Sequence, residues 1–166
     1  MIVGIIGSGG REHAICSKIK ESKKVEKIYC IPGNAGTAKI AENIEIDFND
    51  FYKIKDLILA KKIELLIVGP EKPLVEGIVD FLKETKVKIF GPNKKASQLE
   101  GSKIFTKKLC EKYNIPTAKF GIFSNLIESK EFLENSNYPI VIKADGLASG
   151  KGVYICKNKN EAFFAV

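Results

Sequence analysis

Along residues 1–90, segments with the apolar pattern of strands alternate with segments that have the apolar spacing of helices. A continuous apolar run at 2–6 is typical of a strand buried on both faces; further strand signals occur at 27–31, 65–68 and 87–90, and a weaker one at 43–46. Between them, apolar residues keep the 3.6-residue spacing of amphipathic helices, at 12–20, 52–62 and 74–84. Strands separated by helices imply parallel βαβ units with right-handed crossovers. The pattern therefore predicts an α/β fold, a doubly wound parallel sheet with helices on both faces.

A different arrangement is predicted further along the chain. The elements expected there are a helix, a strand, a polar helix, a hairpin and the start of a last helix, at 103–113, from 119, at 126–134, at 138–156 and from 161. The first of these helices ends ahead of Pro116, which cannot continue it. We place the domain boundary between Asn114 and Thr117, which gives a sheet domain, 1–114, and a small α+β domain, 117–166.

The hairpin contains the most informative loop of the chain. Two β-branched runs, 139–143 and 153–156, enclose a segment of mostly small residues. Backbone N–H groups of such a loop can close on an anion, and Lys143 and Lys151 add positive charge, so the loop predicts a nucleotide triphosphate site. It is not a Walker loop, because Asp145 stands at the first glycine position and a strand follows. A glycine-rich hairpin with two solvated lysines remains the alternative.

A second glycine loop follows the first strand. Gly7, Gly9 and Gly10 lead into the first helix, at the edge where α/β sheets bind ligands. Glu12 occupies the third glycine position of a dinucleotide fingerprint and no acidic residue closes the second strand, so no nicotinamide or flavin cofactor is expected. Glycines at a helix start can hold a phosphate monoester, with Arg11 as a bidentate partner. Alternatively, the glycines only turn the chain and Arg11 faces solvent.

Two further loops end strands of the predicted sheet. Asn34 lies within 32–37, after the second strand, and Glu71 lies within 69–74, after the fourth. The carboxyl ends of parallel strands meet at one edge, so both side chains can reach a ligand there. Glu71 can equally serve only to favour the start of its helix through the helix dipole.

Composition narrows the class of protein. Of 166 residues, 45% are hydrophobic and 28% charged, as in soluble globular proteins. The net charge of +7 comes from scattered lysines beside one arginine and one histidine, His13, so we expect no nucleic-acid partner. No apolar segment has the length of a membrane span and 1–6 lacks a basic leader, so we expect a cytoplasmic protein without a membrane partner. Its four scattered cysteines are expected to be reduced core residues.

Five motifs in a fixed order resemble one family. They are Gly-Gly-Arg-Glu-His-Ala, Pro-Gly-Asn-Ala-Gly-Thr, Gly-Pro-Glu-x-Pro-Leu, Gln-Leu-Glu-Gly-Ser-Lys and Ile-Lys-Ala-Asp-Gly-Leu-Ala-Ser-Gly-Lys-Gly-Val, at 9–14, 32–37, 69–74, 98–103 and 142–153. Together they closely resemble glycinamide ribonucleotide synthetase, or phosphoribosylamine-glycine ligase, of the ATP-grasp superfamily. Ser149 stands where the family more often has alanine. The resemblance spans the chain and implies a Rossmann-like pre-ATP-grasp domain followed by part of an ATP-grasp lid.

The resemblance also implies substrates and site residues. ATP would phosphorylate glycine, and the amine of 5-phosphoribosylamine would attack the acyl phosphate. The implied nucleotide-binding residues are Lys103, Lys143, Ser149, Gly150, Lys151 and Gly152. The implied substrate-binding residues, placed by loop position, are Gly9, Gly10, Arg11, Glu12, His13, Asn34 and Glu71. For Lys103, an ordinary exposed helix lysine is the alternative.

The resemblance further implies what this chain lacks. The family's carboxylate and asparagine ligands for Mg²⁺ belong to a further part of the family chain, so we assign no metal ligand and no catalytic residue here. We therefore expect the N-terminal part of a ligase, inactive alone. Two rival functions stay open. One is another ATP-grasp carboxylate–amine ligase, such as a biotin carboxylase-like or formate-dependent purine enzyme; the other is a non-catalytic phosphoribosyl-binding module.

Overall fold

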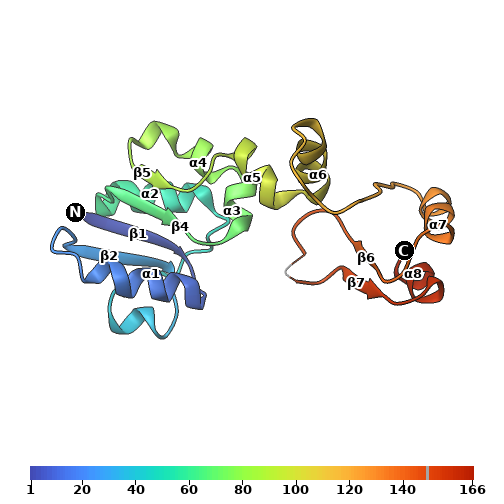
Figure 1. Ribbon diagram of the computed structural model, residues 1–166. Coiled ribbons are helices and arrows are strands. Elements are labelled where there is room, and N and C mark those ends of the chain that lie inside the picture. Colours follow the sequence, from blue (N-terminus) through green and yellow to red (C-terminus); the bar gives the residue numbers. More distant parts are fainter. Residues whose placement is uncertain (149) are drawn as a thin grey trace. The chain divides into compact units, whose positions relative to one another are not determined.

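In the computed structural model, which describes residues 1–148 and 150–166, strand β1 (Ile2–Gly7) lies at the centre of a five-stranded sheet (Figure 1). The strands have the order β3-β2-β1-β4-β5, and every neighbouring pair is parallel. The other four strands are β2 (Lys27–Pro32), β3 (Glu42–Asn43), β4 (Leu65–Val68) and β5 (Lys88–Phe90). The predicted doubly wound parallel sheet is thereby confirmed.

Helices and short turns connect these strands. They are α1 (Gly10–Lys20), η1 (Thr37–Lys39), α2 (Phe51–Lys61), α3 (Glu71–Glu76), α4 (Ile78–Phe81) and η2 (Lys83–Thr85). None of the helices in the described part of the chain is both long and apolar enough to cross a membrane.

Alternate residues of β1 point to opposite faces of the sheet, and each face has its own core. Val3 and Ile5 are fully buried and pack with Cys16 of α1. On the other face Ile6 packs with Ile54 of α2. Because β1 is covered on both faces, its sequence is continuously apolar and not alternating, as a buried parallel strand requires.

The predicted helix over 74–84 is wrong in one respect, because the chain breaks it at Gly77. Gly77 has φ 101°, in the left-handed region that favours glycine, and its N–H donates to the carbonyls of Pro73 and Leu74. Helix α3 ends there and α4 begins. The apolar spacing continues across this break, so periodicity alone did not reveal it.

Three other sequence-based expectations need correction. The predicted third strand over 43–46 is shorter, since only Glu42 and Asn43 pair with β2. No strand forms from Lys119, since 119–123 is neither helix nor strand. Helix α5 (Lys94–Gly101) was not predicted, because Ala96 and Leu99 are its only apolar side chains.

The described residues divide into two compact units, Met1–Gln98 and Leu99–Val166. Helix α6 (Lys103–Lys112) therefore groups with the second unit, whereas the sequence placed it in the first domain. The physical reason is a set of hydrogen bonds from the start of α6 to the hairpin loop, described below. The domain boundary between Asn114 and Thr117 stays a prediction.

The second unit has a small core. Besides α6 it contains α7 (Leu126–Glu134), β6 (Ile140–Lys143), β7 (Val153–Cys156) and α8 (Lys159–Ala165). Strands β6 and β7 pair antiparallel, which confirms the hairpin. Its buried apolar cluster consists of Leu133, Cys156 and Ala162, and Phe164 is 92% exposed. So few buried side chains stabilise this unit weakly.

We expect limited proteolysis to cut first within 115–124, which forms no helix or strand and is mostly exposed, and to leave the sheet unit intact. In hydrogen exchange, amides beyond Thr117 should exchange at least about 100-fold faster than those of β1 and β4. Mass spectrometry of both experiments gives the readout. Equal protection on the two sides of Thr117 would show that the small unit is stable by itself.

Candidate functional site

Three loops meet at one edge of the sheet because of the strand register. Gly7 at the end of β1 lies beside Pro32 at the end of β2, and Ile6 lies beside Val68 at the end of β4. The loops that follow these strands therefore emerge side by side. The chain leaves β1 toward β2 on one side and reaches β4 on the other, so this edge is the switch point where doubly wound sheets bind ligands.

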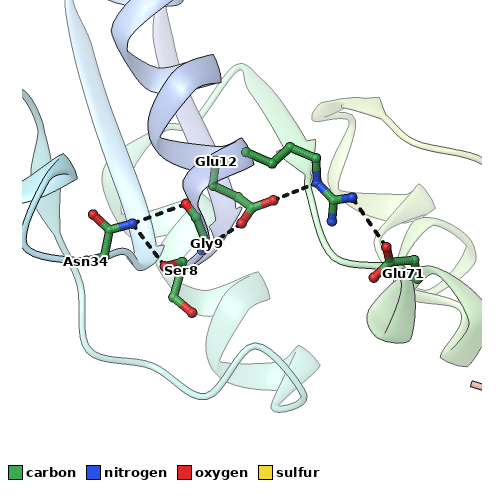
Figure 2. A network of polar contacts seen from close by, with 6 residues as sticks. Ser8, Gly9, Glu12, Asn34 and Glu71 are labelled. Atoms are coloured by element: carbon green, nitrogen blue, oxygen red, sulfur yellow. Dashed lines mark hydrogen bonds and ion pairs between the residues drawn. The ribbon is translucent and has the colours of Figure 1, made fainter. Parts of the chain in front are cut away.

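Glu12, in the first turn of α1, is the buried charge of this edge. Glu12 is only 4% exposed. One carboxylate oxygen accepts a hydrogen bond from the Gly9 N–H at 2.8 Å, and the other accepts one from Arg11 Nε at 3.0 Å (Figure 2). Both carboxylate oxygens of Glu12 thus accept hydrogen bonds from groups of the protein. The assignment of Glu12 to substrate contact stays a prediction; in the structure its carboxylate contacts Gly9 and Arg11.

Arg11 lies between two carboxylates. Its Nη1 is 3.3 Å from Glu71 Oε1, so the guanidinium joins the first helix to the start of α3 (Figure 2). The hydrogen bond with Glu12, helped by Glu71, raises the pKa of Arg11 above its ordinary value. The pKa of Glu71 is lowered, first by its own backbone N–H and then by Arg11. Both groups are about half exposed and charged, so they can meet a ligand from solvent.

Asn34 joins two of the loops. Its Nδ2 donates to the carbonyls of Ser8, at 2.9 Å, and Gly9, at 3.2 Å (Figure 2). Its Oδ1 accepts from the N–H groups of Gly36 and Thr37 at 2.8 and 3.0 Å. All hydrogen-bonding positions of the amide are therefore occupied within the protein, and the side chain holds the loops in register.

The remaining two predicted substrate residues differ in their surroundings. The His13 ring lies against Gly36, where an added Cβ would come within 2.5 Å of His13 Cε1. Gly10 has open space, since nothing lies within 4 Å of the position of a Cβ. The structure thus gathers all seven predicted substrate residues at one edge. Gly10, Arg11 and Glu71 have exposed groups there, whereas Glu12 and Asn34 are engaged with their own loops.

The nucleotide-binding candidates belong to the second unit. Lys143 ends β6 opposite Val153, and the Ala144 N–H donates to the Gly152 carbonyl at 2.8 Å, so the loop starts from a closed hairpin. Gly150 and Gly152 have φ 77° and 70°, in the left-handed region. Ser149 lies outside the described residues. Lys143 and Lys151 are exposed, as cations that meet a phosphate should be.

Lys103 contacts the hairpin loop. Its Nζ donates to the Gly146 carbonyl at 2.7 Å and is partly buried. The alternative of an ordinary exposed helix lysine therefore does not describe it. Its assignment to nucleotide phosphate stays a prediction.

Asp145 was not predicted as a site residue. Its carboxylate accepts hydrogen bonds from Ser102 Oγ, at 3.1 and 3.2 Å, and from the Ile104 N–H at 3.2 Å. Burial acts to raise the pKa of Asp145, but hydrogen bonds from the backbone of Ile104 and Gly146 outweigh it and lower the pKa. Asp145 thus accepts from the first turn of α6, whose N-cap is Ser102, and fixes the loop to the helix. Because 43 positions separate Ser102 from Asp145, no local sequence pattern indicates this contact.

The described residues contain no group of three or more His, Cys, Asp or Glu side chains that could hold a metal ion. The four cysteines, all described, are free thiols. Cys16 and Cys30 lie with their Sγ atoms 3.7 Å apart, and burial raises the pKa of Cys30 to about 12. Cys16, Cys30 and Cys156 are buried core residues, whereas Cys110, expected in the core, is only partly buried.

Two family profiles match the chain in succession. Residues 1–100 match the N domain of phosphoribosylglycinamide synthetase. Residues 101–166 match the ATP-grasp (A) domain of phosphoribosylglycinamide synthetase.

Curated relatives are similar over nearly the whole chain. The phosphoribosylamine–glycine ligase of Caldanaerobacter subterraneus subsp. tengcongensis is 53% identical over 162 residues, 98% of this chain and 39% of the relative. The enzyme of that name from Clostridium acetobutylicum is 51% identical over 158 residues, 95% of this chain and 38% of the relative. The chain thus spans less than half the length of these curated relatives.

Solved structures agree. Phosphoribosylamine–glycine ligase from Thermotoga maritima has a TM-score of 0.78 at 35% identity, over 99% of this chain and 38% of that one. N5-carboxyaminoimidazole ribonucleotide synthetase from Thermotoga maritima has a TM-score of 0.76 at 23% identity, over 99% of this chain and 43% of that one, a likeness that shows the fold alone. These matches confirm the resemblance drawn from the five motifs. The chain belongs to the phosphoribosylglycinamide synthetase family.

Proposed function

We propose that this chain is the N-terminal part of an ATP-dependent ligase that joins glycine to 5-phosphoribosylamine. The observation that carries the proposal is the succession of two domains of one family along the chain, at about half identity to curated ligases of that name. The gathering of three strand-end loops around Arg11 supports it, because such an edge suits a phosphorylated sugar.

The reaction has two chemical steps. A carboxylate oxygen of glycine attacks the γ-phosphorus of ATP, which forms glycyl phosphate and releases ADP. The amine of 5-phosphoribosylamine then attacks the acyl carbon, the C–O bond to phosphate breaks, and the amine loses a proton as glycinamide ribonucleotide forms. Charge builds up on phosphate oxygens in the first step, so fixed cations lower its barrier.

The residues divide between the two substrates. Gly9 to His13, with Asn34 and Glu71, shape the edge for the phosphate and ribose of phosphoribosylamine. Lys143, Lys103 and the loop with Gly150, Lys151, Gly152 and Ser149 serve the ATP phosphates. Lys103 would exchange its contact with the Gly146 carbonyl for a phosphate oxygen.

The proposed ligase uses Mg²⁺, but we assign no magnesium ligand to the residues of this chain. The biotin carboxylase domain of the Hydrogenobacter thermophilus 2-oxoglutarate carboxylase, a fold neighbour at 22% identity, is described in complex with MgADP. The described residues here offer no matching group of carboxylates, so we assign them no step with the metal. Its ligands would come from the rest of the ligase. We propose a cytoplasmic enzyme whose partners are these small molecules, with no nucleic-acid or membrane partner.

Calorimetry on the 166-residue chain tests the division of substrates. Ribose 5-phosphate should bind detectably, because the sheet edge is formed within one compact unit. ATP with Mg²⁺ should bind weakly or not at all, because the hairpin offers only part of a nucleotide site. Micromolar or tighter MgATP binding, a Kd of about 1 μM or below, would contradict this division. Ribose itself, without the phosphate, is the matched control ligand and should not bind.

Lys143 should matter more than Lys151 in a full-length ligase that carries this segment. Lys143 is fixed in direction by the β6–β7 pairing, whereas Lys151 lies between two glycines of a loop. We expect Lys143→Ala to lower kcat/KM for ATP about 100-fold and Lys151→Ala about tenfold or less. Steady-state kinetics with ATP varied gives both values. The reverse order would mean that the loop, and not the strand, positions the phosphates.

Asp145→Ala should raise KM for ATP about tenfold and leave KM for phosphoribosylamine nearly unchanged, since it frees the hairpin loop from Ser102 and Ile104. The folded pKa is lowered, so the stabilisation is present above the ordinary value of about 3.9 and is lost only as the pH falls through the folded pKa. The ratio of mutant to wild-type KM should therefore stay constant from about pH 6 to 8.

Asn125→Ala is a matched control for that variant. Asn125 caps α7 in the same unit, where its side chain accepts from the Glu128 N–H at 2.9 Å. Its loss should lower stability by about 1 kcal/mol without raising KM for ATP. If both variants raise KM equally, Asp145 acts only through the stability of the unit.

A further inference from the structure

Glu12 is an unusual residue for a ligand-binding edge, because it is charged and yet 4% exposed. A buried carboxylate is unfavourable unless it is paired and hydrogen-bonded. Here one partner is the Gly9 N–H of the loop and the other is Arg11 Nε of the same helix, α1 (Figure 2). No other described acid at this edge is buried, since Glu71 is 45% exposed.

Glycines surround the Glu12 side chain. A Cβ added at Gly69 would overlap its carboxylate, one at Gly7 would come within 2.5 Å of its Cγ, and one at Gly9 within 2.9 Å of its Oε2. Gly7 ends β1, Gly9 precedes α1 and Gly69 follows β4. Without side chains, these glycines leave room for the Glu12 carboxylate between the end of β1 and the end of β4, which are neighbouring strands.

The hydrogen bonds of Glu12 decide which groups face solvent. The Gly9 N–H turns inward to Glu12, so the N–H groups of the first helical turn, beginning at Gly10, are those left open for a ligand. Arg11 Nε is occupied by Glu12 and Nη1 by Glu71, which holds the guanidinium plane in one direction. Nη2 has no hydrogen-bond partner among the described residues, so it is the nitrogen left to meet an anion.

We propose that Glu12 is a positioning residue that orients Arg11 and the Gly7–Gly10 loop for the phosphate of the phosphoribosyl substrate and does not itself touch that substrate. The inference rests on the proposed function. It replaces the expectation of a direct contact from Glu12, and it assigns Gly69 of the Gly-Pro-Glu motif to packing around this carboxylate.

Calorimetric titration of ribose 5-phosphate into the 166-residue chain tests the proposal. Glu12→Gln keeps the shape of the side chain, but its NH₂ group cannot accept from Gly9 or Arg11, so one of these two groups loses its partner. We expect Kd to rise about tenfold or more. A wild-type chain that does not bind ribose 5-phosphate would overturn the proposed function, whereas equal binding by wild type and Glu12→Gln would overturn the role of Glu12.

Gly4→Ala is the matched control for stability. Gly4 lies in β1, away from the Gly7–Gly10 loop, and its added Cβ would lie 2.9 Å from Leu66 Cδ1 in the core. We expect it to lower Tm and to leave Kd for ribose 5-phosphate within about twofold, as mutations at separate sites act independently. A rise in Kd that matches that of Glu12→Gln would mean that lost stability, and not lost orientation, weakens binding.

A double-mutant cycle separates packing from positioning, and it also serves if Glu12→Gln does not fold. Gly69→Ala should lower Tm and raise Kd, because it displaces the Glu12 carboxylate. In the Glu12→Ala background the same change should lower Tm less, since the overlap is gone, while Kd stays as weak as in Glu12→Ala alone. An equal loss of Tm in both backgrounds, or recovery of binding in the double variant, would overturn the proposal.

Discussion

The ligand edge of this protein depends on the pairing of β1 with a parallel strand on each side. That pairing sets Gly7 beside Pro32 and Ile6 beside Val68, so three loops leave the sheet at the same level. Loops at such an edge bury few of their own side chains and leave backbone N–H groups without partners. They therefore need internal polar contacts to hold one conformation. Glu12 and Asn34 provide these contacts.

The same principle applies in the second unit with a smaller core. There the hairpin loop is held by Asp145 at the start of α6 and by Lys103 at the Gly146 carbonyl. In both units an acidic side chain holds a glycine loop in place, and under the proposed function the exposed cations Arg11, Lys143 and Lys151 are left for phosphates.

For the ligase proposed here, this arrangement implies preorganisation. Arg11 is held in one direction before any substrate arrives, so binding need not order a long flexible side chain. Lys143, at the end of a paired strand, is fixed through its backbone. Such fixed charges stabilise phosphate at little reorganisation cost, which is the main source of catalysis in phosphoryl transfer.

Much of the fold followed from the sequence, because continuous apolar runs and helical periodicity are local properties. They located all five sheet strands and the hairpin, although β3 is shorter than expected and Gly77 divides a helix that looked continuous. Helix α5 did not follow, since it has only two apolar side chains. The grouping of α6 did not follow either, since it depends on contacts with Asp145.

For the site, the sequence by itself determined which loops carry the glycines, the arginine and the lysines, and the order of its motifs identified the family. Only the tertiary structure decided what each side chain does there. Glu12 and Asn34 look like ligand contacts in a motif, yet their hydrogen bonds are used within the loops, and Asp145 became visible only through its contact with Ser102. The reason is physical. Residue type sets what a group can bond to, whereas the partners that compete for it come from segments far apart in the chain.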